Sequence, residues 1–303
     1  MKRVLLTGAS GFIGRHAWAS LARRGFEIHA VGRARGPIGG PMQWHSADLL
    51  DPRTLDALMR TVRPTHLLHF AWYAEPRDYR ESPENVRWSQ AGMELLVRFA
   101  EHGGQRAVFA GSCFEYDPRW GFCAESLTPS TPETLYGTCK NALRQIALKF
   151  SNRAGISMAW GRIFYLYGPC EPPSRLVPSV ILSLLRDEIA HCSHGRQMRD
   201  FMYVADVADA FAALLDSAVE GTVNVASGEP VTVRALVSRC AQLLGREGRV
   251  EFGAIQASAT DPPAVLADVG RLREQVGWTP QWPLDRALAA TIDWWRKTLR
   301  APN

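Results

Sequence analysis

A glycine-rich turn near the N-terminus constrains the fold of this chain more than any other feature. Residues 4–7 form an apolar, strand-like run, residues 8–14 read Gly-Ala-Ser-Gly-Phe-Ile-Gly, and residues 15–24 have a helical pattern. In such a turn the first glycine permits the sharp bend, the second lets the backbone approach a pyrophosphate, and the third lets the helix pack against the strand. Free N–H groups at the start of the helix also attract phosphates. The turn therefore predicts a dinucleotide-binding site that includes Thr7, Gly8, Ser10, Gly11, Phe12, Ile13 and Gly14.

Strand-like and helical segments alternate over the first 165 residues. The strand-like runs are 3–7, 26–31, 65–71, 106–110 and 156–164. Apolar residues recur at helical spacing in 12–24, 52–62, 84–102 and 132–153. This alternation predicts an α/β fold with a Rossmann-type, doubly wound parallel sheet covered by helices on both faces.

The pattern changes after about residue 169, where four prolines interrupt it within ten residues. The remainder predicts a smaller, mixed α/β C-terminal lobe that closes over the carboxyl ends of the strands, where such sheets bind ligands. We expect residues 1–168, together with 203–228, to form the domain that binds the dinucleotide. Residues 169–202 with 229–303 are then expected to form the substrate-binding lobe.

Composition and charge exclude several classes of function. The 303 residues carry a formal net charge of +5, and the densest basic stretch is only residues 33–35. Nucleic-acid binding would require a longer basic stripe, so we expect anionic small molecules and no nucleic acid as partners. No secretory signal is evident and no apolar stretch approaches the roughly 18 residues of a membrane span. We therefore expect a cytoplasmic protein without membrane contact.

The six cysteines give no sign of a metal site. None of them forms a Cys-x-x-Cys pair, and they are scattered from residue 113 to residue 240. Cys192 lies between His191 and His194, but no second cluster of ligands accompanies it. Reduced thiols of an intracellular protein explain this distribution, and we expect no bound metal.

The residues after the second strand-like run indicate which dinucleotide is bound. A protein that binds NAD places an Asp or Glu there to accept from the ribose 2′-hydroxyl. This chain has Gly-Arg-Ala-Arg at 32–35 instead. We expect NADP(H), with Arg33 on the 2′-phosphate and Ser10 and Arg35 as helpers, because guanidinium pairs with phosphate. The alternative is that these arginines are simply solvated at the surface.

Tyr136 and Lys140 are the leading candidates for acid–base chemistry. They stand at i and i+4, so both project from one face of a helix. Reduction of a ketone needs a proton donor to the carbonyl oxygen. A nearby ammonium would stabilise the phenolate and bring the phenol pKa from about 10 toward neutrality. The spacing alone is common in proteins.

Several motifs together resemble the extended branch of the short-chain dehydrogenase/reductase superfamily, the NAD-dependent epimerase/dehydratase family. The matching segments are 7–14, 48–49, 69–72, 109–116, 136–140, 161–169, 199–206, 224–230 and 276–280. The resemblance spans nearly the whole chain. It implies that Ser112 positions the reacting oxygen, that Tyr136 is the general acid/base, and that Lys140 binds the nicotinamide ribose and tunes Tyr136.

The resemblance also implies roles for residues around this triad. Asp48 and Leu49 correspond to a pair that contacts adenine, and the backbone at Ala71 lines the cofactor. Trp72 replaces the usual alanine and is expected to face the substrate or the nicotinamide. Asp206 is expected to cap a helix, with ligand binding as the less favoured alternative. A homodimer through helices 84–102 and 132–153 is also expected.

The expected substrate is a nucleotide sugar. In the family the position of Arg199 contacts the nucleotide diphosphate, and Tyr165 replaces an Asn that helps to hold the phosphates. The substrate-binding residues expected from the resemblance are Trp72, Cys113, Phe114, Tyr165, Arg175 and Arg199.

Two departures from the family narrow the reaction. A 4,6-dehydratase needs Asp-Glu directly after the serine, where this chain has Cys113-Phe114. A 3,5-epimerase/reductase needs a Cys and a His where Phe114 and Arg175 stand. The favoured function is an NADPH-dependent reductase of a nucleotide-linked 4-keto-6-deoxy sugar, a nucleotide-sugar 4-ketoreductase. A nucleotide-sugar 4-epimerase is the alternative. A non-catalytic, NADP-sensing regulator is disfavoured because Tyr136 and Lys140 are both present.

Overall fold

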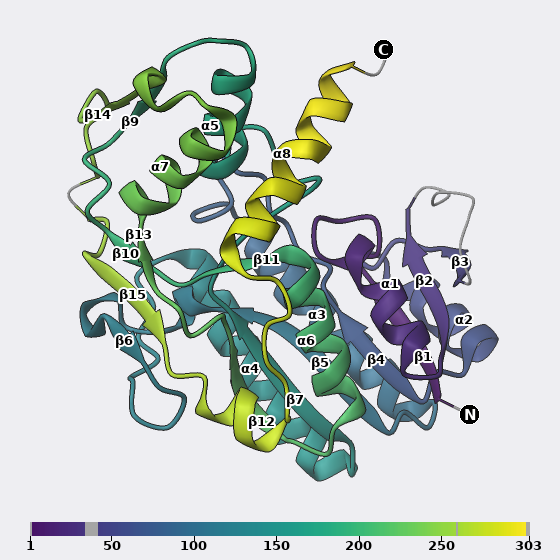
Figure 1. Ribbon diagram of the computed structural model, residues 1–303. Helices are drawn as coiled ribbons and strands as arrows, with labels where there is room; N and C mark the ends of the chain where they lie inside the picture. The colour runs from purple at the N-terminus through teal and green to yellow at the C-terminus, as the bar shows by residue number, and fades with distance from the viewer. Residues whose placement is uncertain (1, 34–41, 259, 301–303) are drawn as a thin grey trace.

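A seven-stranded sheet forms the centre of the molecule (Figure 1). The structure is a computed structural model and describes residues 2–33, 42–258 and 260–300. In spatial order the strands are β12 (Gly221–Val225), β7 (Ser157–Ile163), β5 (Arg106–Ser112), β4 (His66–His69), β1 (Lys2–Thr7), β2 (Phe26–Gly32) and β3 (Met42–Ser46). Every neighbouring pair is parallel. The strand order reverses between β1 and β4, and a sheet of this class binds ligands at that point.

Two layers of helices cover the sheet because successive side chains of a strand point to opposite faces. Val4 and Leu6 of β1 belong to a buried cluster with α1 (Gly14–Arg23) and α6 (Val204–Asp216). Leu5, between them, belongs to a second cluster with α2 (Pro52–Val62), α3 (Glu84–Glu101) and α4 (Leu135–Ala154). The predicted doubly wound α/β fold is confirmed.

The predicted elements agree with the observed ones to within a few residues. The largest difference at a helix start is in α4, which begins at Leu135 and not at residue 132. The hydroxyl of Thr134 accepts a hydrogen bond from the backbone N–H of Gly137 at 3.1 Å, and this cap fixes the first turn. β3 was not among the predicted strands because its sequence, Met-Gln-Trp-His-Ser, has no continuous apolar run.

A smaller lobe is formed by segments that come after β7 and after β12 in the chain. Its core is shared by α5 (Leu176–Leu185), α7 (Val233–Leu244), α8 (Leu284–Arg300), β9 (Ala190–Cys192) and β14 (Val250–Phe252). Short strands form two further small sheets. One has the order β13 (Val231–Thr232), β10 (Met198–Arg199), β15 (Ala264–Ala267) and β6 (Phe122–Cys123), and the other pairs β11 (Phe201–Tyr203) with β8 (Tyr165–Tyr167). Figure 1 shows α5, α7, β9 and β14 gathered at the end of the molecule away from β1–β3.

Asp206 has a different role from the expected one. The N-cap of α6 is Tyr203, and no side chain caps this helix. The carboxylate of Asp206 instead accepts hydrogen bonds from the backbone N–H groups of Gln281 and Trp282, at 3.1 and 3.0 Å. The prediction that Asp206 caps its helix is therefore wrong, because its position within the first turn directs the carboxylate to the segment that leads into α8.

The described residues contain neither a cluster of metal-binding side chains nor a helix that could span a membrane. Among them, no three or more His, Cys, Asp and Glu side chains are grouped so that they could hold a metal ion. His191 pairs with Glu251 at 3.1 Å, and Cys192 is buried. No helix within residues 2–33, 42–258 and 260–300 has the length and apolar character needed to cross a bilayer.

Candidate active site

The glycine-rich turn has the geometry that a pyrophosphate requires. Gly8 has a φ of +66°, and a Cβ atom there would lie 2.7 Å from the backbone nitrogen of Ala71. A Cβ atom on Gly14 would collide with the carbonyl oxygen of Gly8. Ile13 is the N-cap of α1 and makes no side-chain cap, so the first N–H groups of the helix keep no side-chain partner. Phe12, like Ile13, is half-buried. These residues fit a dinucleotide.

Thr7 holds this turn against the neighbouring strand. Its buried hydroxyl lies 2.8 Å from Nδ1 of His69 and accepts a hydrogen bond from the backbone N–H of Ala71 at 3.3 Å. The Thr7 side chain is therefore turned toward β4, where it fixes the carboxyl ends of β1 and β4 relative to each other. Burial lowers the pKa of His69 to about 3, so its ring is neutral.

The residues expected near the adenosine are divided between surface and core. Ser10 and Arg33 are exposed, at the turn and at the end of β2 respectively. Arg35 lies outside the described residues. The Asp48 carboxylate accepts from the backbone N–H of residue 50 at 3.0 Å, and Leu49 is buried in the core. The Arg33 side chain is therefore exposed to solvent, whereas the Leu49 side chain is part of the hydrophobic core.

The start of α4 is pressed against the loop that follows β5. A Cβ atom on Gly137 would collide with the carbonyl oxygen of Phe114, so only glycine allows this approach. The approach brings Tyr136 close to Ser112, the last residue of β5. The hydroxyl of Ser112 accepts a hydrogen bond from the backbone N–H of Phe114 at 3.2 Å. The two predicted catalytic residues are thus brought together by the contact of a helix with a strand end.

Lys140 is buried one turn further along α4. Its ammonium donates a hydrogen bond to the carbonyl oxygen of Ala110 at 2.7 Å and lies 3.7 Å from the centre of the Trp72 ring. Burial lowers the pKa of Lys140 to about 7, and the charge of Glu115 opposes this shift. The Lys140 nitrogen lies 6.0 Å from the centre of the Tyr136 ring.

Tyr136 lies within a ring of aromatic side chains. Trp72, Tyr79 and Phe114 contact it edge-on, with ring centres 6.3, 5.1 and 6.2 Å away. Burial and the neighbouring Tyr79 raise the pKa of Tyr136, and a hydrogen bond with Ser112 opposes the shift. The expectation that Lys140 brings this pKa toward neutrality is therefore not met, because burial dominates. Trp72 was expected to face the substrate or the nicotinamide, and the structure places its ring against both Tyr136 and Lys140. The surrounding aromatic side chains therefore fix the orientation of the Tyr136 phenol.

Glu115 is a residue of this site that the sequence analysis missed. It is completely buried, and its carboxylate accepts from the backbone N–H of Ser112, from Nε1 of Trp160 and from Nε of Arg162, each at 2.8 Å. Nε of Arg144 lies 3.5 Å away. The motif Ser112-x-x-Glu115 is a capping box, so its spacing was a signal that could have predicted the contact with Ser112.

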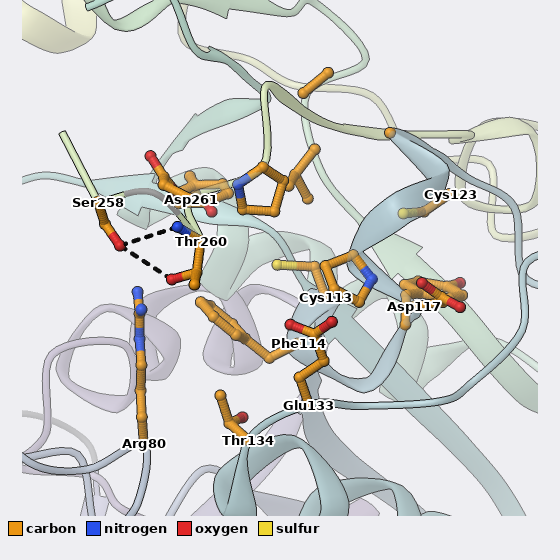
Figure 2. A pocket seen from close by; sticks show the side chains of 17 residues that line it. Arg80, Cys113, Phe114, Asp117, Cys123, Glu133, Thr134, Ser258, Thr260 and Asp261 are labelled. Atoms are coloured by element: carbon orange, nitrogen blue, oxygen red, sulfur yellow. Dashed lines mark hydrogen bonds between the residues drawn. The ribbon is translucent and has the colours of Figure 1, made fainter.

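A cavity of about 330 Å³ opens beside the carboxyl end of β5 (Figure 2). Its size falls within the range of small-molecule sites. The described residues that line it are Arg80, Cys113, Phe114, Tyr116, Asp117, Pro118, Gly121, Cys123, Glu133, Thr134, Tyr165, Ser258, Thr260, Asp261, Pro262, Ala264 and Val265. Of the predicted substrate residues, Cys113, Phe114 and Tyr165 are among them. Burial raises the pKa of the Cys113 thiol to about 12, so the thiol stays protonated.

The two predicted substrate arginines are not among the residues that line this cavity. Arg199 donates to the Asp261 carboxylate at 2.7 Å and to two backbone carbonyls, and it lies over the ring of Tyr165. The guanidinium of Arg175 lies 5.0 Å from the centre of the Tyr79 ring. The ion pair of Arg199 with Asp261 joins residues 62 positions apart, and no pattern in the sequence predicted this contact.

Comparisons with known proteins agree with this geometry. A family model described as the NAD dependent epimerase/dehydratase family matches residues 4–226. UDP-glucuronic acid decarboxylase 1 of Xenopus tropicalis is 26% identical over 98% of this chain and 73% of that protein. UDP-glucose 4-epimerase of Rhizobium leguminosarum bv. trifolii is 24% identical over 97% of this chain and 98% of that protein. The solved structure of MoeE5 with UDP-glucuronic acid and NAD is 30% identical, with a TM-score of 0.84, over 98% of this chain and 99% of that one.

The resemblance noted in the sequence is therefore confirmed at the level of the family. The matched region contains the glycine-rich turn, Ser112, Tyr136, Lys140 and most of the parallel sheet. The match covers well over half of the residues, and the chain belongs to the NAD dependent epimerase/dehydratase family.

Proposed function

We propose that this protein is a nucleotide-sugar 4-epimerase. Tyr136 takes the proton of the C4 hydroxyl and returns one after the sugar has presented its other face, while Ser112 holds the reacting oxygen. A bound nicotinamide nucleotide supplies the hydride acceptor and donor at C4, and the Gly8–Gly14 turn and Lys140 are the residues that would hold it. Lys140 Nζ lies 6.0 Å from the centre of the Tyr136 ring, and in its protonated form it would favour the phenolate that this proton transfer requires.

The observation that carries the proposal is the small set of proton-transfer groups around Tyr136. The positions after Ser112, where a dehydratase needs an acid and a base, hold a thiol with a pKa of about 12 and a phenyl ring. Neither Cys113 nor Phe114 can expel a hydroxyl group. The arrangement therefore supports chemistry confined to C4, and the name of the Rhizobium relative and the ligands of MoeE5 support a nucleotide sugar as the substrate.

An NADPH-dependent reductase of a nucleotide-linked 4-keto-6-deoxy sugar is the second candidate. The sequence analysis placed this function first, and Arg33 is the observation that favours it. Arg33 is exposed at the end of β2, where a 2′-phosphate could pair with its guanidinium. The Rhizobium relative, which is named as a 4-epimerase, favours the epimerase.

A direct test separates the two candidates. Purified protein is incubated without added cofactor with UDP-glucose and, separately, with UDP-glucuronic acid, and the products are resolved by chromatography. The epimerase produces the 4-epimer of one of these sugars. The reductase leaves both unchanged and oxidises NADPH only when a nucleotide-linked 4-keto sugar is supplied. Tyr136→Phe serves as the control, because it should abolish either reaction.

The organisation of the protein follows from the same proposal. We propose that residues 1–168 with 203–228 bind the nicotinamide nucleotide and that 169–202 with 229–303 bind the substrate. We also propose a homodimer through α3 and α4, since Val86 on α3 and Ile146 on α4 are apolar and about half exposed. Light scattering of the purified protein, compared with Ile146→Glu, tests the dimer. A monomeric wild-type protein would contradict it.

A further inference from the structure

The cavity beside α4 contains one arginine that forms no ion pair within the described chain. Asp117, which lines the cavity, pairs with Arg119, and Asp261 pairs with Arg199. Arg80 also lines the cavity. Within residues 2–33, 42–258 and 260–300, no acidic side chain lies at ion-pair distance from its guanidinium. The Asp261 carboxylate acts on Arg80 only from beyond that distance, as one of the weaker influences that raise the pKa of Arg80 against the effect of burial. The cavity wall therefore carries an available positive charge at Arg80.

Arg80 is held in place without being neutralised. Its guanidinium lies 4.9 Å from the centre of the Phe114 ring, and its Nε donates to the hydroxyl of Tyr79 at 3.5 Å. Its backbone carbonyl accepts a hydrogen bond from the backbone N–H of Tyr136 at 2.9 Å. In Figure 2 the side chain extends along the cavity with its nitrogen atoms toward Ser258. Arg80 is thus tied to the residue that performs the proton transfer.

The other charged side chains near the cavity are less available than Arg80 to bind an anion. Arg199 directs three N–H donors at Asp261 and at two backbone carbonyls, so most of its fork is occupied. Arg175 is not among the lining residues. Glu133 does line the cavity, but Figure 2 places it on the other side of Phe114 from Arg80. The cavity therefore has a positive end at Arg80.

We propose that Arg80 binds an oxyanion of the substrate and so determines which nucleotide sugars enter the site. This inference rests on the proposed function, which makes the cavity the substrate site. A guanidinium binds a carboxylate or a phosphate through two parallel hydrogen bonds, so both the acid group of a hexuronic sugar and the nucleotide diphosphate have the required chemistry. Arg80 would replace Arg199, whose charge Asp261 already balances, as the principal cation for the substrate.

Binding measurements test this assignment independently of turnover. Tyr136→Phe, as purified with its bound nucleotide, is titrated by calorimetry with UDP, UDP-glucose and UDP-glucuronic acid. Arg80→Gln and Arg80→Lys are then added in the same background. Arg77→Gln is the matched control, because Arg77 is an exposed arginine of the same loop that does not line the cavity. Thermal unfolding of each variant verifies that it is folded.

The expected result is that Arg80→Gln weakens binding by about tenfold to a hundredfold, as the loss of hydrogen bonds to a charged group implies. Arg80→Lys should lose less, and Arg77→Gln should match its parent. A loss confined to UDP-glucuronic acid identifies the sugar carboxylate as the partner of Arg80. An equal loss for all three ligands identifies the diphosphate.

Two results would overturn the inference. One is an Arg80→Gln protein that binds all three ligands within twofold of its parent. The other is a parent protein that binds none of them at millimolar concentration. Failure of the proposed function has a different signature. If the protein with Tyr136 intact produces no 4-epimer while binding still depends on Arg80, then the anion site stands and the epimerase assignment falls.

Discussion

Two parts of the candidate site are built in opposite ways. We call the buried network around Glu115 the floor, and the side of the cavity formed by Arg80 the wall. On the floor, Glu115 accepts from three groups of Ser112, Trp160 and Arg162, and all four residues are buried. On the wall, Arg80 has an exposed side chain, no ion pair with any described residue, and only a weak hydrogen bond. The hydrogen bonds of the floor hold its side chains in fixed positions, whereas the wall presents a guanidinium that forms no ion pair with the described residues.

This difference suggests how chemistry and specificity are divided in the molecule. In the proposed epimerase, proton transfer at C4 would need Ser112, Tyr136 and Lys140 within a fraction of an ångström of their working positions, and a buried network can supply such order. Substrate choice needs donors that are not already occupied by partners within the chain. Variants of floor residues should therefore change turnover or stability, whereas variants of the wall should change which ligand binds.

Loss of the phenol should have the largest effect. Tyr136→Phe removes the proton-transferring group but leaves its aromatic contacts, so kcat should fall by about 10²–10⁴. Affinity for nucleotide sugars should stay nearly unchanged. Steady-state kinetics and calorimetry on the same preparation measure both quantities. If most of the activity remained, the proton would have to come from a group other than Tyr136.

Glu115→Gln tests the floor by stability. It leaves Arg162 as a buried charge without its partner, which should lower the free energy of unfolding by about 3–5 kcal/mol. Glu84→Gln is the matched control, because Glu84 pairs with Arg87 at the exposed start of α3 and should cost less than about 1 kcal/mol. Equal costs in urea unfolding would contradict the claim that the buried network around Glu115 holds the floor rigid.

The pH dependence of stability tests the burial of Lys140. Its pKa is about 7 in the folded protein and about 10.5 when unfolded. Between these values the unfolded chain binds more protons, so the free energy of unfolding should rise with pH by up to about 1.4 kcal/mol per pH unit. Below pH 7 both states are protonated, so the slope disappears and the full cost of burying the charged Lys140 remains. Subtracting the profile of Lys140→Met, measured on cofactor-free protein, isolates the effect. Parallel profiles between pH 7 and 10 would show that Lys140 is not desolvated.

Much of the floor could be predicted from the sequence because its signals are local. Each of these signals is contained within a few consecutive residues: the glycine-rich turn, the end of β5, and Tyr136-x-x-x-Lys140. Glu115 carried a local signal too, the capping box with Ser112. The wall was harder to predict. Asp261 meets Arg199 from 62 residues away, and Arg80 is a lone arginine in a loop with no periodic pattern.

Arg33 should have the smallest effect, and one that bears on the cofactor. NADP(H) should bind at least tenfold more tightly than NAD(H), about 1.4 kcal/mol, because an arginine stands where a carboxylate would exclude the 2′-phosphate. Arg33→Asp should reverse the preference. Fluorescence titration of cofactor-free protein with both nucleotides provides the measurement. Equal affinities would remove the observation that favours the reductase.

The fate of a label at C4 tests the central claim most directly. UDP-glucose or UDP-glucuronic acid deuterated at C4 is incubated with purified protein, without added cofactor, and the products are analysed by mass spectrometry and NMR. The account predicts a 4-epimer that retains deuterium at C4 and all six sugar carbons, and it predicts no product with Tyr136→Phe. Release of CO₂ with a pentose product would contradict it. So would the absence of any epimer from a protein that oxidises NADPH with a 4-keto sugar.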